Sequence, residues 1–274
     1  MIIDGHSHAC GRYLTAEGII NTLDENSVDK VVLVPGELNG KSEYSLPNIA
    51  SKLPNFNVVK ITNNLTKIIM KLTGKVKDIP AGNEFVYDLK TKTDNRVIQF
   101  LWVTTRIEKI TDYLNTKYDG WAFHGVKMHQ CWEKFSIDSD FFKEVAKWTE
   151  EQDLPLFIHL YSDNDVLQLI EYKREHPKLK LIVAHLFGLE LFIKKFQKDE
   201  NLYFDTSPLQ LVSDSRLQKA IQYVGIEKIL MGTDTPYGAK DNLRKSIDRI
   251  KKLEISKEDQ ELILGTNMKR LLNL

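Results

Sequence analysis

The chain has 274 residues, of which 42% are hydrophobic and 28% are charged. This is the composition of a globular protein, and it excludes the disordered and fibrous classes. Lys and Arg together number 38, as do Asp and Glu, so the overall charge gives no reason to expect nucleic acid or a membrane as a partner. We therefore expect a small-molecule substrate.

Two further features predict a cytoplasmic protein. The first residues, Met1 to His6, lack the basic start and long apolar core of a signal peptide, and no stretch approaches the roughly 18 apolar residues of a membrane span. Cys10 and Cys131 are too few for a disulfide framework. We expect both to be free thiols with a packing role.

Short runs of β-branched and aliphatic residues alternate with stretches of helical spacing, which favours parallel βαβ units. The expected strands are Met1–His6, Lys30–Pro35, Val97–Thr104, Trp121–His129, Leu154–Leu160, Lys180–His185, Asn201–Asp205 and Lys228–Gly232. Repeated strand–helix units of this kind predict an α/β fold, the (β/α)8 TIM barrel, which usually takes about 250 residues. Residues 1–274 are thus expected to form one domain.

One interval is too long for a single helix. The range of about 36–95, between the second and third expected strands, holds far more than the roughly 15 residues that a crossover helix needs. We expect an insertion after strand 2, with a basic helical stretch over Asn64–Lys77. It follows the end of a strand, the side on which barrel active sites are built. A lid over the pocket and a surface or oligomer-contact excursion are both open.

Polar imidazoles occur where a hydrophobic strand would not place them without a partner. The histidines in or beside expected strands are His6, His8, His124, His129, His159 and His185. In an extended chain His6 and His8 point to the same face, so both can bind one metal ion. Asp234 follows the last expected strand. Since the ends of parallel strands meet at one rim, these residues predict a metal site at the barrel mouth.

The fourth expected strand carries a second polar face. Lys127 and His129 lie on one face with Gly125, whereas Val126 and Met128 lie on the other. His124 falls on the opposite parity from Lys127 and His129, and we interpret it as structural.

Several motifs occur in a fixed order along nearly the whole chain: MIIDGHSH, GVKMH, FIHLYS, IVAHLFG, NLYFDTS, MGTDTPYG and ILGTNMKRLLNL. In this order they resemble the amidohydrolase superfamily, in the branch that includes aminocarboxymuconate-semialdehyde decarboxylase, resorcylate decarboxylases and related hydrolases. The resemblance implies metal ligands at His6, His8, His159 and Asp234. Asp234 would also transfer a proton, and His185 would polarise the substrate or complete a second metal site.

The resemblance also bears on the cofactor. It implies one divalent metal, with zinc as the first expectation and manganese as an alternative. A second metal, bridged by a carboxylated Lys127, is less favoured; an unmodified Lys127 and His129 would then contact an anionic group of the substrate. Arg12 and Tyr161 are candidate pocket walls, and a surface position is equally open for Arg12. Asp205, Ser207, Pro236 and Tyr237 could shape the mouth.

These residues favour a metal-dependent hydrolase that attacks a small carbonyl substrate, a lactone, amide or ester, through a metal-activated water. Asp234 would shuttle the proton, and His185 would help to stabilise the oxyanion. The alternative within enzymes is non-oxidative decarboxylation of a small carboxylic acid, with Asp234 or His185 protonating the carbon. A barrel that keeps its metal for binding or structure without turnover is the alternative from another class. Whether the chain forms a homo-oligomer is open.

Overall fold

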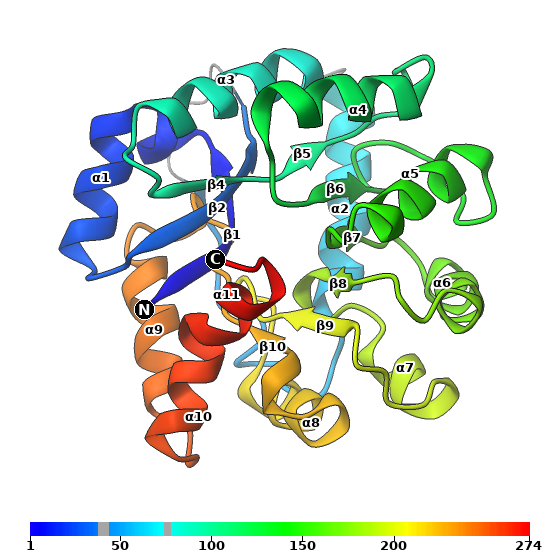
Figure 1. The fold of residues 1–274 in the computed structure, drawn as a ribbon. Helices are drawn as coiled ribbons and strands as arrows, with labels where there is room; N and C mark the ends of the chain where they lie inside the picture. Colours follow the sequence, from blue (N-terminus) through cyan, green and yellow to red (C-terminus); the bar gives the residue numbers. More distant parts are fainter. Residues whose placement is uncertain (38–43, 74–77) are drawn as a thin grey trace.

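The computed structural model describes residues 1–37, 44–73 and 78–274. Parallel strands form a ring in the middle of the molecule, with helices around it (Figure 1). β1 (Ile3–Ala9), β2 (Lys30–Pro35) and β4 (Val97–Gln99) pair in the order β1-β2-β4. A six-stranded sheet continues in chain order through β5 (Leu101–Trp102), β6 (Val126–His129), β7 (Leu156–His159), β8 (Leu181–Val183), β9 (Leu202–Asp205) and β10 (Ile229–Leu230).

Backbone hydrogen bonds join the two sheets into a closed ring. On one side, β4 and β5 are consecutive segments separated by Phe100, whose N–H donates to Leu33 O at 3.1 Å. On the other side, Gly5 N–H donates to Met231 O at 2.8 Å, next to β10. The strand order and the closure confirm the expected TIM barrel.

The helices coat the ring with their apolar faces. They are α1 (Ala16–Glu25), α3 (Ile79–Thr91), α4 (Ile110–Trp121), α5 (Asp140–Glu151), α6 (Asp163–Glu175), α7 (Leu189–Lys195), α8 (Asp214–Val224), α9 (Asn242–Lys251), α10 (Lys257–Glu261) and α11 (Asn267–Leu271). On α5, Phe142, Val145 and Trp148 are buried at the helical step of three. The Ser139 side chain caps the same helix by accepting the N–H of Phe142.

Several expected strand boundaries differ from the structure. The run expected to extend from Met1 to His6 is shifted, because β1 begins at Ile3 and continues to Ala9, so that both His6 and His8 lie within it. Trp121 was expected to begin a strand, yet it is the last residue of α4. Residues 122–125 separate α4 from β6, which begins at Val126. The prediction was wrong because apolar composition does not distinguish the end of a helix from the start of a strand.

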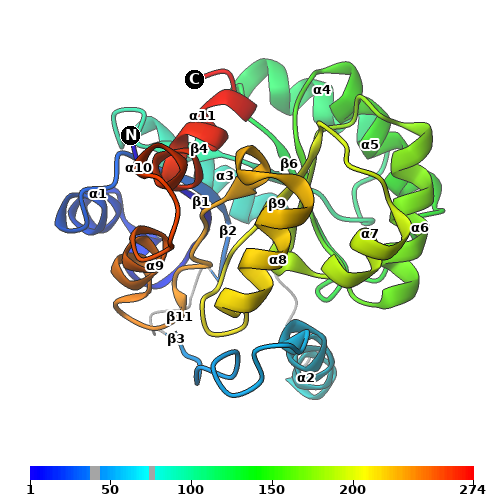
Figure 2. The ribbon, with the colours of Figure 1, turned by 90° about the horizontal axis from the view of Figure 1, so that it is seen from below.

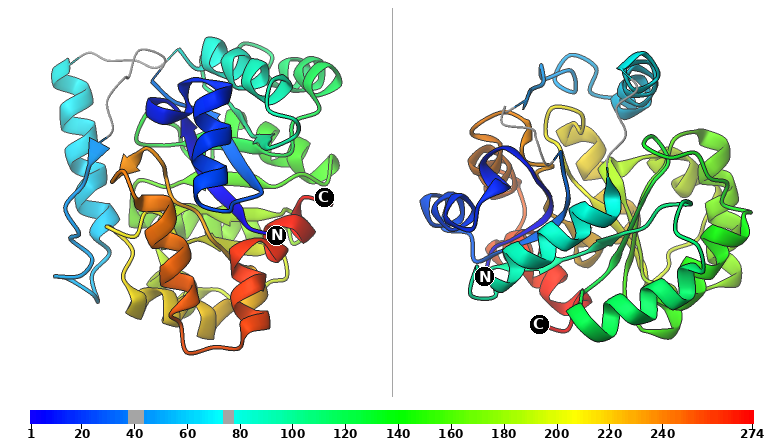
Figure 3. Two further views of the ribbon diagram at one scale, coloured as in Figure 1. Left: turned by 90° about the vertical axis from the view of Figure 1, so that its left-hand side faces the viewer. Right: turned by 90° about the horizontal axis from the view of Figure 1, so that it is seen from above.

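The long interval after β2 contains an ordinary barrel helix and an added segment. α3 belongs to the barrel, and its Gly82 lies so close to β2 that an added Cβ would be 2.7 Å from Pro35 Cβ. The added part holds β3 (Tyr44–Ser45), which pairs with β11 (Tyr237–Gly238), and α2 (Val58–Thr73). α2 crosses the end of the barrel toward which the strands point, and both termini lie at the opposite end (Figures 2 and 3).

α2 accounts for part of the basic stretch expected over Asn64–Lys77, of which residues 74–77 lie outside the described residues, as do residues 38–43 of the expected insertion. Ile61, Leu65 and Ile68 are exposed on this helix. They repeat at steps of four and three, so an oligomer contact on α2 remains an open alternative. Within the described ranges, no helix is both long and apolar enough to cross a membrane.

Candidate functional site

Three of the predicted metal ligands meet at the barrel mouth. Ligand atoms of His6, His8 and Asp234 all lie within 4.8 Å of one another. His8 Nε2 is 3.1 Å and His6 Nε2 is 3.6 Å from Asp234 Oδ1. The Asp234 N–H also donates to the His6 carbonyl oxygen at 2.7 Å. This backbone bond, close to the one from Gly5 that closes the barrel, therefore places the acid beside the first-strand histidines.

Hydrogen bonds determine which nitrogen of each imidazole faces this centre. His8 Nδ1 lies 2.9 Å from Pro35 O, and because a carbonyl can only accept, Nδ1 carries the proton. His6 Nδ1 lies 3.2 Å from Asp205 Oδ2 and 3.0 Å from Ser207 Oγ. Ser207 Oγ gives its own proton to Asp205 at 2.6 Å, so His6 Nδ1 is the donor there. Both histidines consequently present the lone pair of Nε2, the nitrogen that faces Asp234.

A second pair of imidazoles is fixed in the same way. Asn63 Nδ2 donates to Leu160 O at 3.0 Å, which turns Asn63 Oδ1 toward His159 Nε2 at 2.8 Å. His159 therefore carries its proton on Nε2. His185 Nδ1 lies 2.7 Å from Ser207 O and carries the proton of that ring. His159 Nδ1 and His185 Nε2 then face each other, lone pair to lone pair, at 3.1 Å.

Burial disfavours a proton as the bridge between these lone pairs. Desolvation lowers the pKa of His6 and of His159 well below the usual value, and neighbouring positive charge lowers both further. Desolvation also lowers the pKa of His185, although Asp234 and Asp205 oppose it. Facing lone pairs of neutral imidazoles are favourable when a divalent cation lies between or beside them. The residues of the mouth thus fit a metal.

His159 is the fourth predicted ligand. Among the described residues, its ligand atom groups with those of His129 and Cys131 and not with the first three. The rings of His129 and His159 are stacked, with centroids 3.9 Å apart and an angle of 18° between planes. Stacked rings direct their in-plane lone pairs poorly at one common ion. His159 instead connects to the first group through His185, whose ring stacks on His6 at 5.3 Å, and its ligand role stays a prediction.

Lys127 points into the barrel, as the parity of its strand predicts. The side chain is fully buried, and Nζ lies 3.2 Å from His6 Nε2. Nζ also lies 3.7 Å from the centroid of the Phe157 ring. The amine is therefore placed beside the candidate metal centre. Whether it stays an amine or forms a carboxylated bridge remains a prediction.

Arg12 and Tyr161 are both half-buried. Arg12 lies in the short helix η1 (Gly11–Leu14), which directly follows β1 and Cys10. The Tyr161 hydroxyl donates to Asn64 Oδ1 at 2.9 Å, and its backbone N–H donates to Gln130 Oε1 at 2.9 Å. Tyr161 thus joins α2 to the end of β7. Their contact with a substrate stays a prediction.

Known proteins resemble the chain in sequence pattern and in fold. The sequence pattern of the family described as Amidohydrolase matches residues 74–274. The chain belongs to the amidohydrolase family. No curated protein matches this amidohydrolase in sequence.

Solved structures share the fold at low sequence identity. The 5-carboxyvanillate decarboxylase from Sphingomonas paucimobilis is 12% identical with a TM-score of 0.70, covering 100% of this chain and 99% of its own. The 2,6-dihydroxybenzoate decarboxylase from Rhizobium is 16% identical with a TM-score of 0.64, covering 93% and 87%. A probable 2-pyrone-4,6-dicarboxylic acid hydrolase from Acinetobacter baumannii is 15% identical with a TM-score of 0.67, covering 100% and 99%.

Two predicted catalytic residues of this amidohydrolase have a left-handed backbone. The φ angle is +58° at His185 and +59° at Asp234. For residues other than glycine this conformation costs on the order of 1–3 kcal/mol, and it is concentrated at active sites. His185 was expected at the end of a strand, whereas it lies in the 3-10 turn η2 (Ala184–Leu186) that follows β8.

Asp205 is a central residue of the site that the sequence placed merely at the rim. Its Oδ2 accepts from His6 Nδ1, from the His185 N–H at 3.2 Å and from the Ser207 hydroxyl. This carboxylate therefore orients the His6 ring of β1 and holds the backbone of His185 in η2. An acid at the end of a predicted strand is a signal similar to the one that identified Asp234, so the central role of Asp205 could have been found from the sequence.

Asp4 and Asn63 were not identified from the sequence. Asp4 is fully buried, and burial raises its pKa to about 7, although hydrogen bonds from Thr233, from Ser7 and from the His6 N–H lower it. An Asp directly before a Gly is typical of a turn, so the sequence gives no sign of a buried acid at this position. Asn63 lies on a helix of the added segment, and no sequence periodicity relates such a helix to a particular strand end.

A cleft of about 730 Å³ opens beside the site of this amidohydrolase, lined by the start of α3, by the end of β5 and by residues that follow β5 and β6. Trp102 forms its inner wall, and its ring stacks on His129 with centroids 5.4 Å apart and 6° between planes. Trp132, Arg106 and Lys134 line the outer part. The cleft thus offers aromatic surface next to the histidines, and its lining holds the acids Asp78 and Glu133 as well as the two cations.

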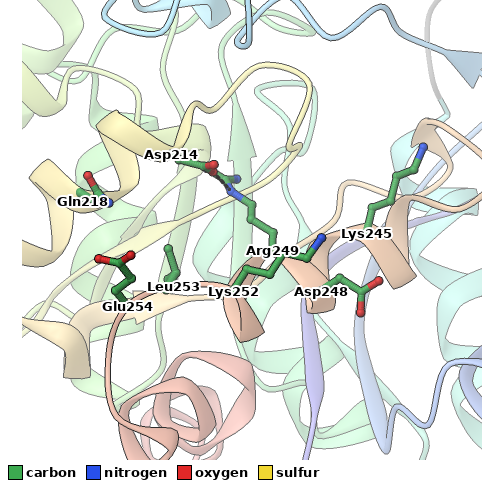
Figure 4. Close-up of a pocket in the computed structure, with 8 residues that line it drawn as sticks. All are labelled: Asp214, Gln218, Lys245, Asp248, Arg249, Lys252, Leu253 and Glu254. Atoms are coloured by element: carbon green, nitrogen blue, oxygen red, sulfur yellow. Dashed lines mark hydrogen bonds and ion pairs between the residues drawn. The ribbon is translucent and has the colours of Figure 1, made fainter.

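Figure 4 shows a different hollow, of about 490 Å³, at the outer surface between α8 and α9. Arg249 Nε donates to Asp214 Oδ1 there at 2.7 Å, and Lys245 extends away from this pair. Acidic and basic side chains alternate in this hollow. Its lining contains none of the predicted site residues, so we place the active site at the barrel mouth.

Proposed function

We propose that this amidohydrolase hydrolyses a small carbonyl compound, a lactone, amide or ester. The observation that carries the proposal is the convergence of His6 Nε2, His8 Nε2 and Asp234 Oδ1 at the mouth. The Nδ1 atoms of both histidines already donate to acceptors, Asp205 and Pro35 O. One divalent ion, zinc or alternatively manganese, would be held by these three residues, with His159 as the fourth ligand.

An ion bound there would polarise the substrate carbonyl and lower the pKa of a water molecule. Asp234 has the position of a proton carrier, because its carboxylate adjoins both first-strand histidines. It would take the proton of the attacking water and return it to the leaving group. His185 donates Nδ1–H to Ser207 O, which leaves Nε2 for the reaction. A protonated Nε2 would stabilise an oxyanion. An unprotonated Nε2 would accept a proton or bind a second ion.

The cleft beside the site supports a planar, anionic substrate. Trp102 and Trp132 supply flat aromatic walls. Arg106 and Lys134 would pair with a substrate carboxylate. Of the two acids in the same lining, Asp78 and Glu133, the latter already accepts hydrogen bonds from the Thr104 and Thr105 hydroxyls. Lys127 and His129 would contact the part of the substrate nearest the metal. The proposed partner is a small molecule, and neither nucleic acid nor a membrane is proposed as a partner. The proposed location is the cytoplasm.

The second candidate function is non-oxidative decarboxylation. It is favoured by the cations of the cleft and by the decarboxylases among the similar solved structures. In this reaction the substrate carboxylate leaves as carbon dioxide, and Asp234 or His185 delivers a proton to the carbon.

One experiment separates the two reactions. Metal-loaded protein is incubated in H₂¹⁸O with a panel of lactones, esters, amides and aromatic carboxylic acids, and products are identified by mass spectrometry. Hydrolysis places one ¹⁸O atom in the product acid, and Asp234→Asn abolishes it. Asp214→Asn, at an exposed side chain outside the site whose replacement can still accept from Arg249, is the matched control. Release of carbon dioxide without ¹⁸O incorporation would establish the decarboxylase, and ligand binding without turnover would support the non-enzymatic alternative.

A further inference from the structure

The helix α2 reaches the candidate metal centre through Asn63. The Asn63 side chain is on the barrel side of the helix and is 3% exposed. Its Oδ1 lies 2.8 Å from His159 Nε2, and its Nδ2 donates to Leu160 O at 3.0 Å. One side chain of the added segment therefore binds both a predicted ligand and the backbone of the residue that follows it.

The two hydrogen bonds of Asn63 depend on each other. Leu160 O can only accept, so the amide nitrogen must face it and the amide oxygen must face the imidazole. The oxygen in turn requires a proton on His159 Nε2. In a neutral ring this leaves the lone pair on Nδ1, the nitrogen that lies 3.1 Å from His185 Nε2. The Asn63 amide thus selects the tautomer of His159 in which the lone pair of Nδ1 faces the site.

Other contacts hold α2 on the same part of the barrel. Lys60 Nζ lies 2.6 Å from Asp163 Oδ2, and the Tyr161 hydroxyl donates to Asn64 Oδ1. Both contacts are exposed, so each contributes little to docking by itself. The buried Val58 and Val59 add apolar contact at the start of the helix. The docked helix consequently keeps Asn63 against the histidine.

We propose that Asn63 is a positioning residue that couples docking of α2 to metal binding at His159. The inference rests on the proposed metal site and goes beyond the proposed reaction. When α2 lies on the mouth, Asn63 keeps the proton of the neutral His159 ring on Nε2, so that Nδ1 carries no proton. By linkage, a metal that binds His159 Nδ1 stabilises the docked position of α2 by the same free energy.

The first test compares two neighbouring asparagines. Asn63→Ala removes the acceptor of the Nε2–H, and Asn64→Ala removes an equal amount of an exposed side chain on the same helix. Zinc affinity is measured on metal-free protein by competition with a chromophoric chelator. Loss of an outer hydrogen bond to a ligating histidine typically weakens metal binding about 10–100-fold. We expect this loss in Asn63→Ala and an affinity like that of the wild type in Asn64→Ala.

A second measurement distinguishes positioning from loss of structure. ¹⁵N NMR of histidine-labelled, metal-free protein reports the tautomer of His159. We expect Nε2–H in the wild type and in Asn64→Ala, and a mixture of tautomers in Asn63→Ala. Asn63→Asp keeps an acceptor for the Nε2–H, so its zinc affinity should lie closer to the wild type than that of Asn63→Ala, even if loss of the Leu160 bond lowers its stability.

Hydrogen exchange provides the reciprocal readout. Zinc should increase amide protection in α2 of the wild type, and the increase should be smaller in Asn63→Ala. Equal zinc affinity in both alanine variants, or an unchanged His159 tautomer in Asn63→Ala, would overturn the inference. Wild-type protein that binds zinc with this coupling but turns over no substrate would overturn the proposed hydrolysis alone.

Discussion

His8 Nε2 and Asp234 Oδ1 lie 3.1 Å apart, although Pro35 O holds the proton of the His8 ring on the other nitrogen. Two lone pairs at this distance repel unless a positive charge lies with them. We therefore predict that the purified protein contains about one equivalent of divalent metal. Asp234→Ala and His6→Ala should each lose it, and activity should fall by at least about 10²-fold because the proton carrier or a ligand is gone.

The measurement is elemental analysis of protein purified without added metal, for the wild type and both variants. Asp248→Ala, in the outer hollow, controls for handling and should keep the metal. A wild-type protein that remains metal-free when zinc and manganese are supplied would contradict the proposed site.

Asp205 acts on two histidines at once, and this gives a second prediction. Its Oδ2 accepts from His6 Nδ1 and from the backbone N–H of His185. Asp205→Asn keeps the shape but weakens the acceptor, so we expect metal affinity to fall about 10–100-fold. Calorimetric titration with zinc measures the change. An affinity equal to that of the wild type would show that the His6 ring is oriented without this carboxylate.

The metal-free protein should lose stability as the pH falls below about 6.5. The folded pKa values of His6, His159 and His185 are lowered from 6.5, so below that pH the unfolded chain binds more protons. The stability that they contribute is present above pH 6.5 and is lost as the pH falls toward the folded values. Asp4 acts in the opposite sense, because its pKa rises from 3.8 to about 7 and its contribution is lost as the pH rises through that range.

Three histidines have lowered pKa values and one carboxyl group has a raised one, so stability should fall on balance as the pH decreases below 6.5. Each net proton that the unfolded chain binds in excess contributes about 1.4 kcal/mol per pH unit to this slope. Urea unfolding of metal-free protein at pH 7.5, 6.0 and 5.0 measures it. Asp4→Asn removes the opposing group and should steepen the slope. Stability that stays constant or increases toward pH 5 would refute the assignment of neutral, buried imidazoles.

The sequence predicted the barrel and the meeting of His6, His8 and Asp234 because both depend on strand ends. Parallel strands deliver their last residues to one rim, so a polar residue after an apolar run can be placed without knowing the packing. Phe100, which separates β4 from β5, shows the limit of the same reasoning, since the composition of the run Val97–Thr104 does not indicate a break in the strand at this residue.

The proton positions of the site were beyond sequence reasoning. They depend on Asn63, Pro35 and Ser207, which approach the histidines from other segments of the chain. Pro35 ends a predicted strand, yet nothing in its sequence neighbourhood indicates that its carbonyl meets His8. Contacts of this kind follow from the register between strands and from the docking of α2, which the order of residues alone does not specify.

Lys127 provides the last prediction, since its amine lies 3.2 Å from His6 Nε2 and 3.7 Å from the Phe157 ring centroid. Lys127→Met keeps an unbranched side chain against the aromatic ring while it removes the nitrogen. If the amine is unmodified and contacts an anionic substrate group, the variant keeps one equivalent of metal and its KM rises. Intact-protein mass spectrometry and elemental analysis check the state of the lysine. Two equivalents in the wild type and one in Lys127→Met would instead establish a carboxylated bridge, because an uncharged thioether cannot replace the carbamate oxygens between two ions.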